Sequence, residues 1–479
     1  MSTTSDLTAP ATTPRRAGPR ILLRALLVLL LLVALAAACA VYAVNRGGAP
    51  QTATQLGAEP QLGERETFPI PKVNAPDVVG WPSGRAPTAP DGFAVTRFAG
   101  ELEHPRWLYE LPNGDVLVAE SATLPKDPGS PIMQLFYWLR RNDGSTTERS
   151  ANRITLLRDT NGDGVADFRS VFLENLNQPF GMALLAASPP YALSPSAANG
   201  TEAAFYVAGT DGVWRFPYKL GETRVTGTGK KILDLPAGGY NNHWTRNLFA
   251  SADGTKLYVT VGSSSNVGEY GMEAERRRAA VLEINPDGSG ERTLASGLRN
   301  PNGLGIEPHS KTLWTVVNER DLLGDDASPD YLTRVRPGDF YGWPWSYWGR
   351  HVDDRVQPQR PDLVARALRP DYALGAHTAP LGLAFAESPA FPERYRGGAF
   401  ITEHGSWNRG DPVGYKVVYV PFKDGMPSGK PQDFLTGFKP APDESTTYGR
   451  PVGVITGKNG RLLVADDAGN TIWHVAPRP

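Results

Sequence analysis

The sequence predicts an all-β fold, a six-bladed β-propeller that follows an N-terminal apolar segment. The chain has 479 residues, and its 51 glycines and 43 prolines are typical of a protein with many turns and short strands. Long amphipathic helical patterns are scarce beyond the N-terminus. A unit made of a turn and a strand also recurs along the chain, which favours repeated β-sheets over a single sandwich.

The repeat is a Pro-x-Gly-apolar turn. It occurs at residues 179–182, 301–304, 380–383 and 451–454, and in degenerate form at 104–108 and 243–248. A second turn and an apolar strand follow most copies, as at Leu257–Val259 and Leu462–Val464. Six copies about 55–80 residues apart predict six similar β-units, and such units close radially into a propeller. Six unrelated hairpins in a sandwich are the alternative, and the shared order of turn and strand disfavours it.

The N-terminus predicts a membrane segment. Residues 1–24 form a basic tail, and residues 25–44 are 20 apolar residues without a charge, enough to span about 30 Å. The preceding arginines predict a cytoplasmic N-terminus, with the remainder on the periplasmic or extracellular side of the cell membrane. A signal-peptidase site at Ala36–Ala38 and a lipoprotein site at Cys39 are alternatives. All three readings export the main domain.

Residues 45–90 are rich in Pro, Gly and Thr and predict a linker, followed by the propeller domain at residues 91–479. The 49 Lys and Arg against 50 Asp and Glu give a net charge of -1, which does not suggest a nucleic-acid partner. Cys39 is the only cysteine, which excludes a disulfide framework and a thiol metal site.

Corresponding loops of a propeller meet at one end of its central channel. The residues that precede the repeated strands should therefore line one pocket: His243, Arg299, Asn300, Arg450 and the segment around Gln178. A lone histidine beside Trp244 is by default a structural residue, and its position in the repeat favours a functional role. Arg299 and Asn300 have a similar alternative, a turn that caps a strand.

Several motifs in the same order carry a family resemblance. They are His243 with the hairpin after it, and residues 297–304, 317–321, 341–344, 403–409 and 450–453. From Phe93 to the C-terminus the chain resembles the quinoprotein sugar dehydrogenases, and within them the sorbosone dehydrogenase-like branch.

The resemblance implies an enzyme that oxidises a sugar or a related aldehyde or alcohol by hydride transfer to pyrroloquinoline quinone (PQQ), with calcium. An external acceptor, a quinone or a cytochrome, would then take the electrons. His243 matches the general base, and Arg299 and Asn300 match residues at the quinone carbonyl. Arg450 matches an arginine that pairs with cofactor carboxylates. The remaining cofactor-binding candidates are Gln178, His404 and Arg409, and His404 has the alternative of fixing its own loop.

Two departures from the family pattern affect the site. Ser263 stands where other members carry an aspartate, so an orienting carboxylate would have to come from elsewhere. The loop that offers calcium its backbone carbonyls corresponds in this chain to Arg320 and Asp321, after Glu319. The carboxylates of Glu319, Asp321, Asp325 and Asp326 are the alternative set of calcium ligands.

A second calcium loop is predicted at residues 159–167. Its oxygens come from Asp159, Asn161, Asp163, the Val165 carbonyl and Asp167, at EF-hand-like spacing. Ser170 replaces the bidentate glutamate of a complete EF-hand, so a polar hairpin turn is the alternative. For the whole domain, a binding propeller without catalysis and a metal-dependent lactonase-type hydrolase remain alternatives.

Overall fold

The computed structural model describes residues 19–46, 48, 50–66, 72–125, 138, 140–144, 146–194, 196–441, 444–457 and 460–478. The chain divides into two units, Met1–Gly47 and Gly48–Pro479. In the first unit the described residues form the helix α1 (Pro19–Arg46). Residues 1–18 of the predicted basic tail lie outside the described residues.

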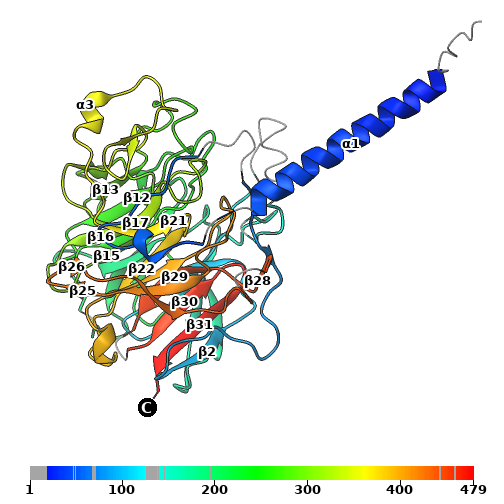
Figure 1. Cartoon of the computed structure of the whole chain (residues 1–479). Helices are drawn as coiled ribbons and strands as arrows, with labels where there is room; N and C mark the ends of the chain where they lie inside the picture. Colours follow the sequence, from blue (N-terminus) through cyan, green and yellow to red (C-terminus); the bar gives the residue numbers. More distant parts are fainter. Residues whose placement is uncertain are drawn as a thin grey trace, which may run out of the picture. The chain divides into compact units, whose positions relative to one another are not determined.

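The second unit contains the six predicted blades (Figure 1). Each blade is a four-stranded antiparallel sheet, whose strands run in order from the channel to the outer edge. Blade 1 is β3 (Pro105–Glu110), β4 (Val116–Glu120), β5 (Arg153–Arg158) and β6 (Phe168–Leu173). Blade 2 is β7 (Met182–Ala186), β8 (Glu202–Gly209), β9 (Gly212–Lys219) and β10 (Lys230–Asp234). Blade 3 is β11 (Leu248–Ala250), β12 (Leu257–Val261), β13 (Ala280–Ile284) and β14 (Arg292–Ser296), to which β18 (Asp339–Phe340) adds a parallel strand.

Blade 4 is β15 (Asn300–Ile306), β16 (Leu313–Asn318), β17 (Pro329–Arg334) and β21 (Tyr372–Ala376). Blade 5 is β22 (Pro380–Phe385), β23 (Ala399–Glu403), β24 (Lys416–Val420) and β27 (Gln432–Leu435). Blade 6 is β29 (Pro451–Thr456), β30 (Leu462–Asp466), β31 (Thr471–Pro477) and β2 (Phe93–Ala99). The antiparallel pairing of β2 with β31 joins the first blade strand of the chain to the last and closes the ring.

Short strands and helices occur outside the four-stranded blades. They are the strand pairs β1 (Asp77–Val78) with β28 (Thr446–Thr447), β19 (Ser346–Tyr347) with β20 (His351–Val352), and β25 (Phe422–Lys423) with β26 (Met426–Pro427). Short helices in the described part of the chain include η1 (Ala53–Gln55), α3 (Pro361–Val364) and η2 (Glu393–Tyr395).

The glycine of the repeated turn explains how the inner strands pack around the channel. A Cβ atom on Gly303 would lie 2.7 Å from the backbone nitrogen of Leu383, in the inner strand of the next blade. On Gly382 it would lie 2.5 Å from the carbonyl oxygen of Val452, again one blade further on. Any larger residue would separate neighbouring inner strands, so the repeat marks the close contact between blades.

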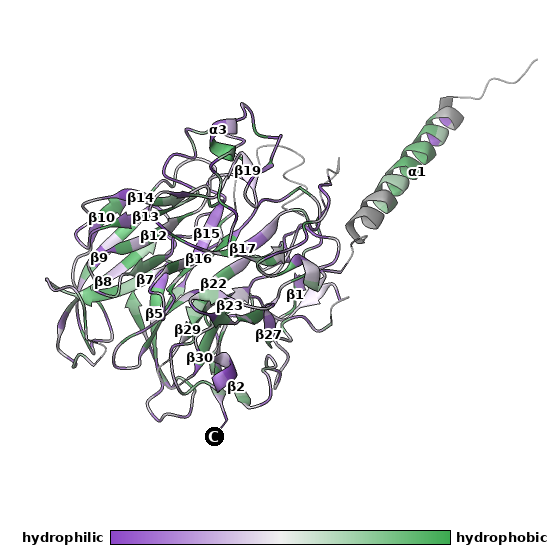
Figure 2. Ribbon diagram, turned by 60° about the vertical axis from the view of Figure 1, so that its left-hand side comes forward, coloured by the Kyte–Doolittle hydropathy of each residue, from purple (hydrophilic) through white to green (hydrophobic). Residues whose placement is uncertain are grey.

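The core lies between the blades. The strands β4, β13 and β23 are buried along their whole length, because each sheet has a neighbouring blade on both faces. Their mostly apolar sequences, each with a single glutamate, agree with this two-sided burial. Figure 2 shows hydrophobic colouring along the blade strands and hydrophilic colouring over much of the loops.

The predicted linker over residues 45–90 is wrong for its described part, because residues 50–66 and 72–90, which we call the strap, contact the propeller. Gly57 forms a β-bridge with Ala373, and β1 pairs with β28. The Lys72 ammonium group is buried 3.0 Å from the Asp325 carboxylate. The Pro- and Gly-rich composition indicates irregular backbone, and it does not reveal that tertiary contacts satisfy that backbone.

The predicted membrane segment, residues 25–44, falls within α1. In the part of the chain that the structure describes, no helix combines the length and the apolar character needed to cross a membrane.

Candidate functional site

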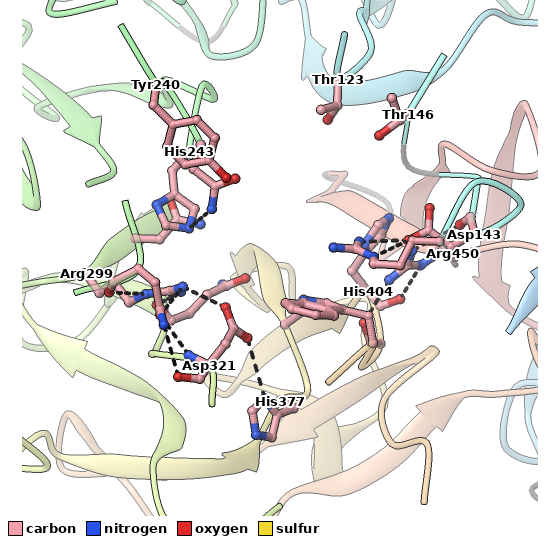
Figure 3. A pocket seen from close by; sticks show the side chains of 18 of the residues that line it. Thr123, Asp143, Thr146, Tyr240, His243, Arg299, Asp321, His377, His404 and Arg450 are labelled. Carbon is pink, nitrogen blue, oxygen red and sulfur yellow. Dashed lines mark hydrogen bonds and ion pairs between the residues drawn. The ribbon is translucent and has the colours of Figure 1, made fainter. Parts of the chain in front are cut away.

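A cavity of about 1020 Å³ opens where loops of several blades meet (Figure 3). Its walls come from loops that precede inner strands and from loops that follow second strands. The sequence-predicted residues that line it are His243, Arg299, Asn300, Glu319, Asp321, His404 and Arg450. Residues from blades 3, 4, 5 and 6 thus meet at one site, as the repeat predicted for His243, Arg299, Asn300 and Arg450.

His243 precedes β11, and its ring is held by the hairpin that follows β12. Nδ1 lies 2.9 Å from both the carbonyl oxygen and the hydroxyl oxygen of Ser263. The Ser263 hydroxyl donates to the carbonyl of Ser265 over 2.6 Å, so both Ser263 atoms are acceptors for Nδ1–H. The proton therefore resides on Nδ1, and Nε2 carries the ring's lone pair. Ser263 thus performs the orienting role for which a carboxylate was expected.

A glycine beside His243 makes the site compact. A Cβ atom on Gly262 would lie 2.4 Å from Asn300 Oδ1 and 2.5 Å from His243 Cβ. The absence of a side chain at Gly262 thus allows His243 and Asn300 to approach each other across the ends of two blades. Asn300 is buried, and its Oδ1 has no hydrogen-bond partner among the residues that the structure describes.

Arg299 is a buried connection between two loops of the wall. Nε and Nη2 donate to the backbone and side-chain oxygens of Asn266, Nη1 donates to the carbonyls of Asn318 and Glu319, and Nη2 also pairs with Asp321 over 2.8 Å. All five N–H donors of the guanidinium are therefore directed to protein acceptors. Arg299 contributes positive charge to the cavity wall and fixes the Asp321 carboxylate.

Asp321 and His377 form an ion pair that the sequence did not predict. Asp321 Oδ1 lies 3.7 Å from His377 Nδ1, and His377 Nε2 donates to the carbonyl of Gly324 over 2.9 Å. Burial raises the pKa of Asp321, but the charge of Arg299 and the contact with His377 outweigh it and hold this pKa well below its usual value. Burial lowers the pKa of His377, and the bond to Asp321 reverses this and raises it. His377 stands three residues before the Pro380 repeat, a position that the repeat could have marked.

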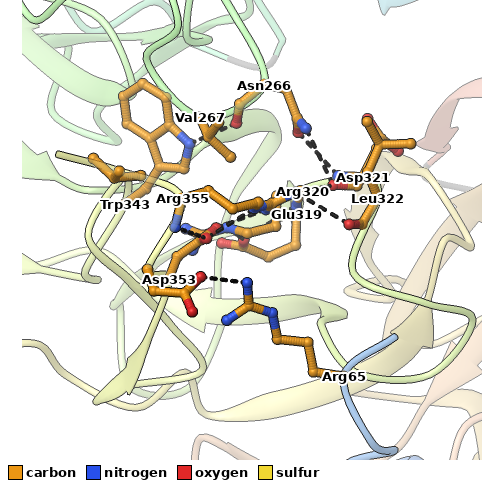
Figure 4. A network of polar contacts seen from close by, with 12 residues as sticks. Arg65, Asn266, Val267, Glu319, Arg320, Asp321, Leu322, Trp343, Asp353 and Arg355 are labelled. Carbon is orange, nitrogen blue, oxygen red and sulfur yellow. Dashed lines mark hydrogen bonds and ion pairs between the residues drawn. The ribbon is translucent and has the colours of Figure 1, made fainter. Parts of the chain in front are cut away.

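The loop after β16 is held from behind by a second network (Figure 4). Arg320 is fully buried, lies 3.4 Å from Asp353, and donates to the Ser346 carbonyl over 2.9 Å. The Asp321 carbonyl accepts from Asn266 Nδ2 and from Arg355 Nη1, each over 3.1 Å. Both lone pairs of the Asp321 carbonyl are therefore engaged, and Arg320 is not among the residues that line the cavity.

Two buried carboxyl groups remain in this region. Glu319 Oε1 has no hydrogen-bond partner within the described ranges, its residue lines the cavity, and burial raises the pKa of this residue. Asp330 in β17 accepts from the backbone nitrogens of Glu319, over 2.6 Å, and Ala379, over 2.8 Å. Burial raises the pKa of Asp330 to about 7. Asp330 therefore joins the loops of blades 4 and 5, and its buried strand position carries no sequence signal.

The opposite wall contains Arg450, which precedes β29, and His404, which follows β23 (Figure 3). Arg450 donates from Nε to the His404 carbonyl over 3.0 Å, from Nη1 to the Asp143 carbonyl over 3.1 Å, and from Nη2 to the Gly405 carbonyl over 2.8 Å. Within the described part of the chain these contacts use three of its five N–H donors and leave two for a ligand.

Two of the predicted cofactor-binding residues lie outside the cavity lining. Gln178 donates from its side-chain amide to the Ala122 carbonyl over 2.8 Å, and it thereby holds the start of the loop that contains the cavity residue Thr123. Arg409 is fully buried and bonds to the Asp325 carbonyl and to Asp326. Both residues support the loops of the site rather than its surface.

The loop at residues 159–167 directs its side-chain oxygens to its own backbone. Asp159 accepts from the nitrogens of Gly162, over 2.7 Å, and Gly164, over 2.8 Å. Asp163 accepts from Val165 over 2.8 Å, and Asp167 accepts from Thr160 over 3.0 Å. The described ranges contain no group of three or more His, Cys, Asp or Glu arranged to hold a metal ion. Calcium at this loop stays a prediction.

Family models match three parts of the chain. The model described as Glucose / Sorbosone dehydrogenase matches residues 211–404, which include His243, Arg299 and Asp321. The TrAA12-like model matches residues 361–478, and a domain of unknown function matches residues 85–188.

Solved structures share the fold. The holo form of the pyranose dehydrogenase PQQ domain from Coprinopsis cinerea aligns with a TM-score of 0.63 at 19% identity, covering 83% of this chain and 99% of that one. The calcium structure of the Trichoderma reesei carbohydrate-active enzyme of family AA12 aligns with a TM-score of 0.64 at 19% identity, covering 85% of this chain and 99% of that one. At such identities these likenesses bear on the fold alone, and they agree with the six-bladed propeller.

Curated relatives match shorter stretches. An uncharacterized protein of Borreliella burgdorferi is 32% identical over 50% of this chain and 62% of its own length. A PQQ-dependent pyranose dehydrogenase of Coprinopsis cinerea is 28% identical over 44% of this chain and 34% of its own length. The chain thus spans less than two thirds of these relatives. With the family match at residues 211–404, these findings confirm the resemblance, and the chain is a relative of the glucose/sorbosone dehydrogenase family.

Proposed function

We propose that the propeller is a PQQ- and calcium-dependent dehydrogenase that oxidises a sugar or a related aldehyde or alcohol, with His243 as the general base. The observation that carries this proposal is the fixed tautomer of His243 in the cavity wall. Its Nδ1 proton is held by Ser263, so Nε2 is the atom that accepts a proton.

The residues present suit the quinone. PQQ is a planar tricyclic anion with three carboxylates, and a cavity of about 1020 Å³ has room for it beside a sugar. Arg450 has two N–H donors left for a carboxylate, in the fork geometry that guanidinium offers. The positive charge of Arg299 lies in the opposite wall, beside His243, and the N–H donors of Arg299 are engaged by the protein (Figure 3).

The cavity offers calcium fewer protein ligands than a complete calcium site has. Glu319 Oε1 and Asn300 Oδ1, unpartnered within the described residues, are hard oxygen atoms of the kind that calcium prefers, and both residues line the cavity. The Asp321 carbonyl, predicted as a ligand, already accepts two hydrogen bonds. We therefore assign any calcium in this cavity to side-chain oxygens of Glu319 and Asn300 together with oxygens of the cofactor.

The chemistry divides between cofactor and chain. When bound, the quinone supplies the hydride acceptor, and calcium polarises its carbonyl. His243 Nε2 removes the hydroxyl proton of the substrate, and Ser263 stabilises the imidazolium that forms by accepting from Nδ1. Arg299, which the resemblance assigns to the quinone carbonyl, would supply fixed positive charge to that side of the cavity. A lactonase-type hydrolase needs several carboxylates around a metal ion. The described ranges contain no group of three or more His, Cys, Asp or Glu that could hold a metal ion.

The test is reconstitution of the full chain with PQQ and calcium. We expect a change in quinone absorbance and reduction of an artificial electron acceptor with at least one member of a panel of aldoses. His243→Ala should lower kcat by about 10²–10⁴-fold and leave the Kd of PQQ within a few-fold. His309→Ala, at an exposed turn, is the matched control.

Two outcomes would overturn the proposal. Wild-type protein that neither perturbs the quinone spectrum nor reduces the dye would leave the binding-propeller alternative. A His243→Ala protein that turns over normally would show that a different residue is the base.

We further propose that the domain works outside the cytoplasm and passes its electrons to an external quinone or cytochrome. Arg15, Arg16, Arg20 and Arg24 precede the apolar stretch in the sequence, as in exported proteins. A phosphatase reporter fused after residue 479 should be active only if the C-terminus is exported, and activity of a cytoplasmic reporter at that position would contradict the proposal.

A further inference from the structure

The wall opposite His243 contains a second histidine whose tautomer is fixed by other means. His404 Nε2 lies 3.0 Å and 3.2 Å from the two carboxylate oxygens of Asp467, the residue after β30. Asp467 is fully buried and forms an ion pair with Arg106 of β3. Three blades therefore supply a chain of contacts from Arg106 through Asp467 to His404.

The charge state of this chain of contacts is set by its neighbours. Burial raises the pKa of Asp467, but the contacts with His404 and Arg106 outweigh burial and hold this pKa well below its usual value, so the group is a carboxylate. Burial and the charge of Arg450 lower the pKa of His404 to about 4, although Asp467 opposes them. His404 is therefore a neutral imidazole near pH 7 and a poor proton acceptor.

The tautomer follows from the acceptor character of the carboxylate. Asp467 as a carboxylate can only accept, so Nε2 of His404 must carry the ring proton. The nitrogen that remains to meet a ligand in the cavity is Nδ1, which then offers a lone pair. Arg450 presents its two remaining N–H donors on this wall, and Nδ1 of His404 adds an acceptor to the same wall.

We propose that Asp467, backed by Arg106, locks His404 as a hydrogen-bond acceptor for an N–H or O–H group of the bound ligand. His404 is thus a binding residue and Asp467 a positioning residue, whereas His243 performs the proton transfer. The two sources of such a donor are the pyrrole N–H of PQQ and a hydroxyl of the sugar. This inference rests on the proposed function, since it concerns the ligands of the same cavity.

The key variant is Asp467→Asn, which keeps the size of the side chain and lets its amide donate to Nε2. His404 should then hold its proton on Nδ1 and turn a donor toward the ligand. Asp466→Asn is the matched control, because Asp466 is the adjacent buried aspartate and bonds to Trp81, Trp473 and the backbone of Arg450 and Gly469 rather than to His404.

The first readout needs no cofactor. Long-range ¹H–¹⁵N spectra of protein labelled at its seven histidines should show His404 protonated at Nε2 in the wild type and in Asp466→Asn, and at Nδ1 in Asp467→Asn. An unchanged tautomer in Asp467→Asn would overturn the lock, whether or not the protein binds PQQ.

The second readout assigns the donor. If the donor belongs to the cofactor, the Kd of PQQ should rise roughly 10-fold or more in Asp467→Asn, the effect of a lost and opposed hydrogen bond. If it belongs to the sugar, the Kd of PQQ should hold and KM should rise by a similar factor. The proposal would be overturned if Asp467→Asn and Asp466→Asn had the same Kd for PQQ and the same KM for the sugar.

A pair of substitutions at His404 covers the case in which Asp467→Asn fails to fold. His404→Asn places an oxygen near the position of Nδ1 and should retain ligand binding within a few-fold, whereas His404→Leu should lose it to the same extent as expected for Asp467→Asn. Equal binding by both would contradict an acceptor role. Wild-type protein that binds no PQQ would instead refute the proposed function and leave the tautomer result intact.

Discussion

Gly262→Ala tests the arrangement of the site, because one methyl group would collide with two residues that the proposed reaction needs. The new Cβ would lie 2.4 Å from Asn300 Oδ1 and 2.5 Å from His243 Cβ. Carbon atoms in contact are normally about 3.5–4.0 Å apart, so His243 and Asn300 must separate from residue 262 by roughly 1 Å. Such a displacement typically costs about 10²-fold in rate, or about 2.7 kcal/mol of transition-state stabilisation.

The assay is dye-linked aldose oxidation by protein reconstituted with PQQ and calcium, together with the free energy of unfolding in denaturant. We expect kcat to fall about 100-fold, while overpacking lowers the unfolding free energy by about 1–3 kcal/mol. Gly238→Ala is the matched control, because a Cβ there meets no atom of the described residues within 4 Å. It should retain wild-type kcat and stability.

A Gly262→Ala protein with wild-type kcat would refute the reasoning, since it would show that the placement of His243 against Asn300 does not govern the reaction. A variant that unfolds would also contradict the expected 1–3 kcal/mol, because that loss leaves a domain of this size folded.

Three further predictions concern the strap, a buried acid and the second calcium loop. Lys72→Met should lower the free energy of unfolding by about 3–5 kcal/mol, because it leaves the buried Asp325 carboxylate without its cation. Glu59→Gln, at an exposed ion pair of the same strap, is the control and should have little effect. Equal unfolding free energies of the two variants would contradict the strap contact. Burial raises the pKa of Glu403 to about 8, so the folded state holds a proton that the unfolded state releases above about pH 4.5. Glu403 should therefore lower the unfolding free energy by up to about 1.4 kcal/mol per pH unit as the pH rises toward 8. Glu403→Gln should reduce the measured slope by that amount, and an unchanged slope would refute the assignment. Excess calcium should raise the Tm of PQQ-free protein and not that of Asp163→Asn, and a rise in both would place the ion elsewhere.

The sequence alone determined the number of blades. Pro301-Asn302-Gly303-Leu304 and its copies each place a glycine at the point where the inner strand of the next blade packs. Because this is a local requirement of the strand, the repeated glycine is visible in the sequence. The same periodicity predicted that His243, Arg299 and Arg450 would meet, because equivalent positions in a closed ring share one end of the channel.

Partners far apart in the chain were decided only by the tertiary structure. No local pattern pairs His377 with Asp321, or His404 with Asp467 and Arg106, because each of these contacts joins loops or strands of neighbouring blades. Composition also misassigned the strap, since it reports the polarity of a segment and not whether Lys72 finds a buried carboxylate. Local packing requirements recur as a pattern in the sequence. The pairing of charges between blades depends on which segments, distant in the chain, become neighbours when the ring closes.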